Sequence, residues 1–342
     1  MRLSPDTTRN VGKTSLDGQH ERAPLSVLPS STVVADSVSK SFGETVVVED
    51  VSLEVGRGEV FALIGPSGSG KTTLIRMMVG LAIPTGGSLK VLDCEPRNFR
   101  PAHRGEIGYV PQSFVLYPTL TVEQNARFVA GLYGMGWLQK RRRIRETLQL
   151  LELWDARRRR ASQISGGMKR RLSLACALLH SPRILFVDEP TAGLDPILRS
   201  TIWEHLRSLA SWGTTVFVTT QHLDESERCD RVAMLNAGSI VALGSPAELR
   251  RQALGGDALE IQGPKFDWAD ADALRALPSV RSLSSTAVGR IRVVVDDIAT
   301  ATPQVSACLN ERGVQVDKIE ADNPSFDEVF VALVDRANGS ER

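Results

Sequence analysis

One eight-residue segment constrains this chain more than any other: Gly65-Pro-Ser-Gly-Ser-Gly-Lys-Thr72. It fits the pattern GxxxxGK[ST], in which glycines let the backbone curl so that successive N–H groups point inward. The apolar run Val60–Ile64 precedes it and a helical stretch, residues 73–81, follows it. A strand, a glycine-rich loop and a helix in that order create an anion site at a helix N-terminus. This context argues against a chance glycine-rich turn and predicts a phosphate-binding loop.

The side chains of this loop indicate which phosphate compound binds. Lys71 can reach the β- and γ-phosphates of a nucleoside triphosphate, and the hydroxyl of Thr72 can ligate Mg²⁺. We therefore expect ATP and Mg²⁺ as ligands. The residues predicted to contact the nucleotide are those of the loop and the first helical turn: Gly65, Pro66, Ser67, Gly68, Ser69, Gly70, Lys71, Thr72 and Thr73.

A second signal is the segment Arg183-Ile-Leu-Phe-Val-Asp188-Glu189-Pro190, an apolar strand that ends in two carboxylates. The carboxyl ends of strands in an open α/β sheet face the ligand crevice. Asp188 is then placed to hold Mg²⁺, and Glu189 to orient or deprotonate a water that attacks the γ-phosphate. A solvated strand end would explain the pair equally well in isolation, but the loop upstream favours catalysis.

A third signal is Ser165-Gly166-Gly167, which stands before a helical run at residues 168–179. Serine is a common N-cap residue, so the segment predicts a helix start. A serine hydroxyl, glycine N–H groups and a helix dipole also form an anion site. We expect both roles to hold.

Apolar runs that alternate with helical stretches across residues 31–245 predict an α/β domain. The runs expected as strands are residues 46–48, Val60–Ile64, 184–187, 215–219 and 232–235. Residues 115–180, rich in Leu, Arg and Lys, are predicted to be helical, and Thr121 with Gln124 reads as a capping box. Residues 1–30 lack any periodicity, and we expect a disordered tail there.

The C-terminal part, residues 256–336, changes character after Gly255-Gly256. The predicted order is strand, helix, two strands, helix and strand, which is the ferredoxin-like split βαβ arrangement. The ranges are 258–262, 269–277, 279–284, 290–295, 299–312 and 314–319, with a last helix at 325–334. We predict a small α+β accessory domain that is dispensable for nucleotide chemistry. Val329, Phe330 and Leu333 on its last helix could pair with a second copy or dock on the same chain.

Taken together, the motifs resemble the ATP-binding cassette of ABC transporters. The order of the motifs is a Walker A loop at 65–72, a glutamine after a strand at 112, SGG at 165–167, Walker B at 184–189, Gly-Leu-Asp at 193–195 and Gln-His at 221–222. Each motif is weak in isolation, but their common order is highly specific and covers residues 31–245. The resemblance implies a Mg²⁺-dependent ATPase of the P-loop class with a helical subdomain.

The resemblance also implies roles for residues that the pattern alone does not explain. Phe42 matches the aromatic residue that stacks on adenine, although an ordinary core aromatic is the alternative. Gln112 matches the glutamine that senses Mg²⁺ and nucleotide and faces the membrane partner. Asp195 matches an aspartate at the cassette dimer interface, and His222 matches the histidine that touches the γ-phosphate. By the same resemblance, Ser165-Gly166-Gly167 contacts ATP that a second cassette holds.

Two features suggest a subfamily. The signature reads Ile164-Ser-Gly-Gly-Met168 rather than the commonest LSGGQ, and basic residues follow it. This ending and the C-terminal segment resemble the cassettes that serve ABC-2 permeases in drug, sodium or polysaccharide export. The implied partners are a transmembrane ABC-2-type permease and a second cassette, and the implied location is the cytoplasmic face of the inner membrane. An importer cassette and a soluble ABC ATPase acting on ribosomes or DNA are the alternatives.

Composition limits the remaining possibilities. The net charge is +1, so no global basic field for nucleic acid exists, and nucleic-acid binding is not expected. No apolar stretch reaches the roughly 20 residues that a membrane-spanning helix needs. Two basic runs, residues 140–143 and 157–160, lie in the predicted helical region. They read as a solvated face or as a contact with anionic lipid headgroups.

Overall fold

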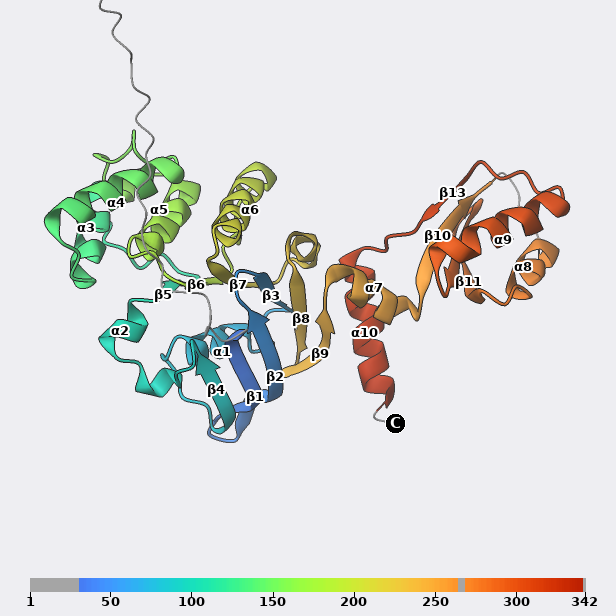
Figure 1. Ribbon diagram of the computed structural model, residues 1–342, viewed down its shortest axis with the longest axis horizontal. Coiled ribbons are helices and arrows are strands. Elements are labelled where there is room, and N and C mark those ends of the chain that lie inside the picture. Colours follow the sequence, from blue (N-terminus) through green and yellow to red (C-terminus); the bar gives the residue numbers. More distant parts are fainter. Residues whose placement is uncertain (1–30, 264–267, 341–342) are drawn as a thin grey trace, which may run out of the picture. The chain divides into compact units, whose positions relative to one another are not determined.

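The computed structural model describes residues 31–263 and 268–340, and Figure 1 shows their helices and strands. The predicted tail at residues 1–30 lies outside the described residues. No helix in the described part of the chain combines the length and the apolar character needed to cross a membrane.

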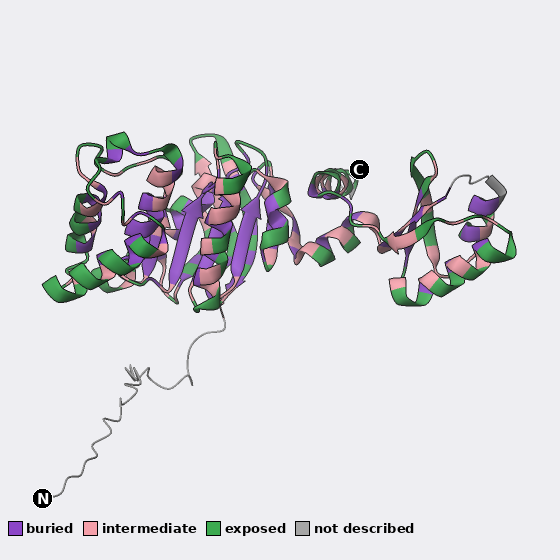
Figure 2. Cartoon of the chain, turned by 90° about the horizontal axis from the view of Figure 1, so that it is seen from above, coloured by how far each residue is buried: buried purple, intermediate pink, exposed green. Residues whose placement is uncertain are grey.

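A six-stranded sheet forms the centre of the cassette, in the order β5-β6-β7-β3-β8-β9. The first five strands run parallel and β9 pairs antiparallel with β8. Its strands are β3 (Val60–Ile64), β5 (Ile107–Val110), β6 (Ile184–Asp188), β7 (Thr215–Thr220), β8 (Arg231–Asn236) and β9 (Ser239–Gly244). Every residue of β3, β6 and β7 is buried, as expected for apolar runs in a sheet covered on both faces (Figure 2).

A separate antiparallel sheet, in the order β2-β1-β4, was largely missed by the sequence prediction. Its strands are β1 (Ser31–Phe42), β2 (Thr45–Gly56) and β4 (Gly86–Val91). The predicted strand at residues 46–48 is only the start of β2. Register shifts between Ala35 and Val38 and between Val38 and Lys40 interrupt the alternation of β1. The alternation of inward-facing and outward-facing residues, which would identify a strand in the sequence, is therefore interrupted.

Three helices make up most of the region predicted as helical: α3 (Val122–Leu132), α4 (Trp137–Leu150) and α5 (Gly166–Leu178). The capping box is present, because Thr121 Oγ1 accepts from the Gln124 N–H and the Gln124 side chain accepts from the Thr121 N–H. The prediction of a continuous helical region at 115–180 was too broad. Turns and the short helix η2 (Ala161–Gln163) occupy most of the segment between α4 and α5.

The remaining helices of the cassette connect or flank these sheets. They are α1 (Lys71–Met78), η1 (Pro96–Asn98), α2 (Pro101–Arg104), α6 (Pro196–Ser211), η3 (Leu223–Arg228) and α7 (Pro246–Leu254). Helix α7 ends at Gly255, whose left-handed backbone (φ 83°) terminates the helix. The first glycine of the Gly255-Gly256 pair is thus the C-cap of α7.

The C-terminal region contains a four-stranded sheet in the order β11-β12-β10-β13, with every described pairing antiparallel. This is the ferredoxin-like arrangement that the sequence predicted. Its elements are β10 (Asp257–Gln262), α8 (Trp268–Arg275), β11 (Val280–Ala287), β12 (Arg290–Val295), α9 (Ile298–Glu311) and β13 (Lys318–Ala321). The last strand was predicted too early, at 314–319, since only Lys318–Ala321 pairs with β10.

The last helix, α10 (Phe326–Ser340), packs on the cassette of the same chain. Phe326, Val329 and Leu333 are buried in the same apolar cluster as Leu249 and Ala253 of α7. Phe330, which is partly buried, packs against the same cluster. Of the two contacts considered from the sequence, the structure therefore supports docking on the same chain.

Candidate functional site

The glycine-rich loop lies between β3 and α1, and its glycines are required by its geometry. A Cβ on Gly65 would lie 2.1 Å from the Leu235 carbonyl oxygen, so no larger residue fits. Gly68 and Gly70 have φ values of 82° and 104°, in the region that favours glycine. Gly70 is also the N-cap residue of α1. The loop therefore folds directly over a helix N-terminus, where N–H groups and the helix dipole favour an anion.

Two side chains of the loop suit a polyphosphate. The Lys71 ammonium donates to the carbonyl oxygens of Gly65 (2.8 Å) and Pro66 (2.9 Å) and is 4% exposed. Burial lowers its pKa, opposed by the nearby carboxylates of Glu189 and Asp188. The hydroxyl of Ser69 is buried and has no hydrogen-bond partner among the described residues. A buried ammonium and an unpaired buried hydroxyl in one anion nest fit a nucleotide phosphate chain.

Asp188 lies at the C-terminal end of β6 and is 1% exposed. Its Oδ1 accepts hydrogen bonds from the hydroxyl of Thr72 at 3.3 Å and from that of Thr219 at 2.5 Å. The loop, β6 and β7 thus converge on one carboxylate oxygen. Hydroxyl and carboxylate oxygens are the hard ligands that Mg²⁺ prefers, so Thr72 and Asp188 fit a Mg²⁺ ion.

Glu189 follows at the edge of the sheet, 8% exposed and with a left-handed backbone (φ 47°). Its N–H donates to both the carbonyl and the hydroxyl oxygens of Thr219 (3.0 and 3.1 Å), which holds the strained residue in place. Its carboxylate accepts from the Gln112 amide at 2.6 Å and lies 3.9 Å from the Lys71 nitrogen. Three predicted site residues that are far apart in sequence therefore meet around one carboxylate. The alternative of a merely solvated strand end does not fit this arrangement.

The Ser-Gly-Gly segment begins helix α5 as predicted. The hydroxyl of Ser165 accepts from the Met168 N–H at 3.2 Å and is the N-cap. A Cβ on Gly167 would lie 2.7 Å from a methyl group of Leu198 in α6, so this glycine permits close packing of α5 and α6. Asp195 caps α6 by accepting from the N–H groups of Ile197 and Leu198. Both Ser165 and Asp195 are exposed to solvent, so neither side chain is buried in the core.

Comparison with known families gives two matches along the chain. Residues 48–192 match the ABC transporter family, and residues 244–334 match the C-terminal domain of DrrA1-3-like ATP-binding proteins. The daunorubicin resistance ATP-binding protein DrrA3 of Streptomyces coeruleorubidus is 34% identical over 307 residues, which span 90% of this chain and 96% of that protein. This chain belongs to the ATP-binding subunits of ABC transporters. The members of this family are ATPases.

Other relatives also match the cassette, but their matches cover a smaller share of this chain than the match to DrrA3 does. The Nod factor export ATP-binding protein I of Paraburkholderia xenovorans is 42% identical over 69% of this chain and 78% of its own length. The probable multidrug ABC transporter ATP-binding protein YbhF of Escherichia coli is 40% identical over 66% of this chain. The match spans only 39% of the length of YbhF.

A solved cassette gives the same fold. The cassette MJ0796, described as a dimeric post-hydrolysis state bound to ADP and Pi, superposes with a TM-score of 0.57 at 29% identity. The match covers 62% of this chain and 98% of MJ0796. An ABC cassette fold is therefore shared over nearly all of that protein.

Arg170 is a residue of this ABC cassette that sequence reasoning did not assign to the site. Its guanidinium donates to the carbonyl oxygen of Pro111 at 3.0 Å and to that of Glu189 at 3.1 Å. Burial lowers its pKa, while Asp188 and Glu189 act in the opposite direction. Arg170 thereby ties the loop that carries Gln112 to the end of β6. Its only signal in the sequence is a position one helical turn after the signature glycines.

Two further predicted residues, His222 and Phe42, make no hydrogen bond to Asp188 or Glu189 within the described ranges. The His222 N–H donates to the Thr220 hydroxyl just beyond β7, and its imidazole makes no hydrogen bond within the described part of the chain. Phe42 lies at the end of β1, is 55% exposed and has the Lys40 ammonium 4.9 Å from its ring centre. This exposure argues against the core-aromatic alternative and leaves the part of the ring that Lys40 does not cover available for stacking.

Proposed function

We propose that this chain hydrolyses ATP between the glycine-rich loop and Glu189, and that it powers a separate membrane-spanning exporter. The observation that carries the proposal is the position of the Glu189 carboxylate, 2.6 Å from the Gln112 amide and 3.9 Å from the Lys71 ammonium. A carboxylate that accepts from an amide and lies near a buried cation is held in a fixed orientation. It can then accept a proton from water as a general base.

The other residues divide the remaining work. Lys71, Ser69 and the N–H groups of the loop would bind the phosphates, and Phe42 would stack on the adenine. Thr72, Asp188 and Gln112 would hold Mg²⁺, which neutralises charge on the β- and γ-phosphate oxygens when bound. His222, directly after β7, would contact the γ-phosphate. The Arg170 guanidinium would hold Gln112 and Glu189 in fixed positions relative to each other, since it donates to the carbonyl of Pro111, beside Gln112, and to that of Glu189.

We further propose that two cassettes complete each site together. Ser165 and Gly166 are exposed at the start of α5, and Asp195 is exposed at the start of α6. An exposed N-cap serine beside glycines is an anion site still open to a partner. Closure of two cassettes on ATP would place each signature against the nucleotide of the other copy. This movement would drive the permease, which we propose to be of the ABC-2 type and to hold the chain at the cytoplasmic face of the membrane.

The exporter direction and the role of residues 257–321 rest on the relatives. Three of them are named for multidrug transport, Nod factor export and daunorubicin resistance. The match to a DrrA-like C-terminal domain favours the last group over an importer or a soluble ABC ATPase. We propose that the four-stranded unit is an accessory domain outside the nucleotide chemistry, because all the candidate site residues belong to the cassette.

Mixing two inactive variants tests the paired site. Lys71→Ala removes the ammonium from the loop, and Ser165→Arg places a bulky cation at the signature. In a mixed dimer, one composite site carries both changes and the other carries neither. ATP hydrolysis should therefore reappear on mixing, with each variant alone as the control. Absence of any recovery, together with a monomer in the presence of ATP in size-exclusion chromatography, would refute the paired site.

A further inference from the structure

A cavity of about 550 Å³ lies in the helical region, and no residue of the phosphate loop lines it. The N-terminal halves of α3 and α4 and the segment after α4 line it. Six basic side chains face it: Arg127, Lys140, Arg141, Arg145, Arg157 and Arg158. Residues 144–156 separate the two basic runs noted in the sequence, and both runs contribute side chains to this one cavity.

The charge around this cavity is compensated only in part. Glu123 is the one carboxylate in its lining, and it already pairs with Arg127 at 2.6 Å. Within the described ranges, no carboxylate lies at ion-pair distance from Lys140, Arg141 or the three remaining arginines. Like charges around one cavity repel each other, and a bound anion would relieve that repulsion.

The four basic residues of the run 140–143 have two different environments. Arg142 and Arg143 pair with Glu146, at 2.7 and 3.4 Å, and Arg143 also donates to the last carbonyl groups of α5. These two arginines have structural partners. Lys140 and Arg141 instead face the cavity. Only part of the run is therefore an ordinary solvated or structural face.

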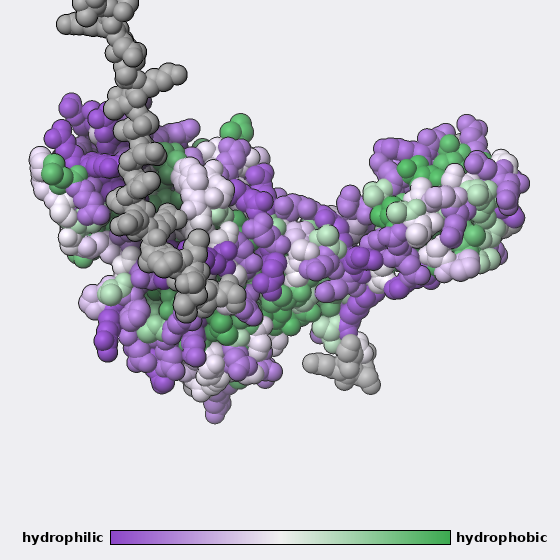
Figure 3. Space-filling view, viewed as in Figure 1, coloured by the Kyte–Doolittle hydropathy of each residue, from purple (hydrophilic) through white to green (hydrophobic). Residues whose placement is uncertain are grey.

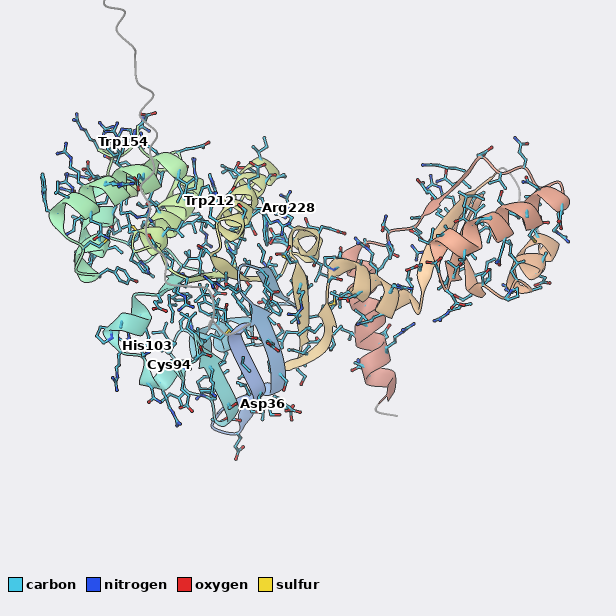
Figure 4. The ribbon with its side chains drawn as sticks, in the orientation of Figure 1. Asp36, Cys94, His103, Trp154, Trp212 and Arg228 are labelled. Carbon is cyan, nitrogen blue, oxygen red and sulfur yellow. The ribbon has the colours of Figure 1, made fainter. Side chains whose placement is uncertain are left out.

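Tryptophan rings position the unpaired arginines. Arg145 and Arg157 lie on the Trp154 ring, with the guanidinium carbons 5.4 and 4.4 Å from its centre. Arg141 lies 6.0 Å from the centre of the Trp137 ring. Arg157 also donates to the Trp154 carbonyl oxygen at 2.9 Å. A guanidinium that is held by its face keeps its other N–H groups available for contact with a phosphate. Figure 4 shows Trp154 among nitrogen-bearing side chains at this end of the helical region.

Apolar side chains project beside the basic ones. Leu132, Trp137 and Leu138, at the turn between α3 and α4, are 71%, 70% and 75% exposed. Figure 3 shows a mostly hydrophilic surface over this region with separate hydrophobic spots. Tryptophan and leucine beside lysine and arginine are the combination found where proteins meet the membrane interface.

We propose that this basic cavity binds the phosphate of anionic phospholipid headgroups, while Leu132, Trp137 and Leu138 enter the interfacial layer of the bilayer. The proposal rests on the proposed function, which places the cassette beside a membrane. An acidic protein segment would match the charge but would leave three exposed apolar side chains without a role. A lipid surface uses both features.

Flotation with vesicles tests this assignment on the full chain. The vesicles consist of phosphatidylcholine alone or of phosphatidylcholine mixed with phosphatidylglycerol. The wild type should bind the mixed vesicles and not the neutral ones, and added salt should weaken binding. The variant Arg141→Glu/Arg145→Glu/Arg158→Glu should bind about 100-fold more weakly, since each of the three basic residues near an anionic surface contributes about a factor of 5.

The matched control is Lys90→Glu/Arg100→Glu/Arg104→Glu, which makes the same charge change at exposed positions on β4 and near α2. This control should bind like the wild type, and both variants should hydrolyse ATP at the wild-type rate. If the wild type bound the mixed vesicles but did not hydrolyse ATP, the proposed function would be wrong and the lipid assignment would stand, because vesicle binding is measured separately.

Three results would overturn the lipid assignment. The first is equal weakening of binding in the two variants, which would show a general charge effect. The second is displacement from vesicles by millimolar inorganic phosphate, which would identify a soluble anion as the ligand. The third is binding of polyglutamate by the wild type without any binding to the mixed vesicles, which would point to an acidic protein partner. Weaker binding by a Trp137→Ser/Leu138→Ser variant would support insertion of the apolar side chains.

Discussion

At the scale of single residues, Glu189 is the most constrained group of the candidate site. Its backbone has a positive φ, its N–H makes two bonds to Thr219, and its carboxylate contacts both Gln112 and Lys71. A strained backbone that the surroundings hold at a buried acid is a common feature of functional sites. Asp188, its neighbour in sequence, is oriented differently, because hydroxyl groups of Thr72 and Thr219 bond to it. Two adjacent carboxylates can therefore serve different purposes, one for a metal ion and one for a proton.

Replacement of Glu189 by glutamine tests this division. The amide keeps the shape of the side chain but cannot accept a proton, so ATP hydrolysis should fall by about 100-fold or more. ATP affinity should be preserved or higher, because the loop that binds the phosphates is unchanged. Phosphate release and a fluorescent-nucleotide titration measure the two quantities. Hydrolysis at the wild-type rate would remove Glu189 from the catalytic role.

At the scale of elements, the site depends on three loops that follow parallel strands, and Arg170 of α5 ties two of them together. Its planar fork bonds the carbonyl of Pro111, beside Gln112, and that of Glu189. A lysine at this position is expected to make only one of these two contacts. Arg170→Lys should therefore lower the rate of ATP hydrolysis by about 10-fold while nucleotide affinity stays the same.

The neighbouring arginine provides a matched control. Arg171 bonds Leu151 and Glu152, inside the helical region and away from both loops. Arg171→Lys should leave the hydrolysis rate close to that of the wild type. If both variants lost activity equally, the effect would be one of α5 stability, and the role of Arg170 in joining the two loops would be wrong.

Elements also show how far the sequence could predict this structure. The glycine-rich loop, the buried parallel strands and the capping box of α3 followed from motifs and from local periodicity. Strand β13 did not, because its position is set by pairing with β10, where Ile319 lies opposite Ile261. Val314 and Val316 pack on the same core without joining the ladder, so their apolar character suggested a strand too early. Arg170 was missed for a similar reason: its partners come from loops after β5 and β6, which are adjacent only in the folded sheet.

At the scale of the whole molecule, the C-terminal region combines two parts that the sequence treated as one. The four-stranded sheet has an apolar core of its own, formed by β10, β12, α8 and α9. Helix α10 instead buries Phe326, Val329 and Leu333 against the cassette. Arg250 of α7 strengthens this contact through an ion pair with Glu227, a hydrogen bond to Pro324 and its position 4.7 Å from the centre of the Phe326 ring. The helix thus completes the cassette, although it follows the accessory unit in sequence.

Two deletions separate these parts. In the first, a short glycine–serine linker replaces residues 257–321, which is feasible because the Asp322 N–H bonds the Ala258 carbonyl at 2.8 Å, so the two ends of the unit are adjacent. In the second, the chain ends at Leu254 and lacks α10.

Burial of three large apolar side chains contributes about 1.5–3 kcal/mol each, so loss of α10 should lower the unfolding temperature by roughly 10 °C or more. The linker variant should unfold near the wild-type temperature and keep ATP binding and hydrolysis. Calorimetry and phosphate release measure both outcomes, and a folded linker variant that no longer bound ATP would contradict an accessory role for the four-stranded unit.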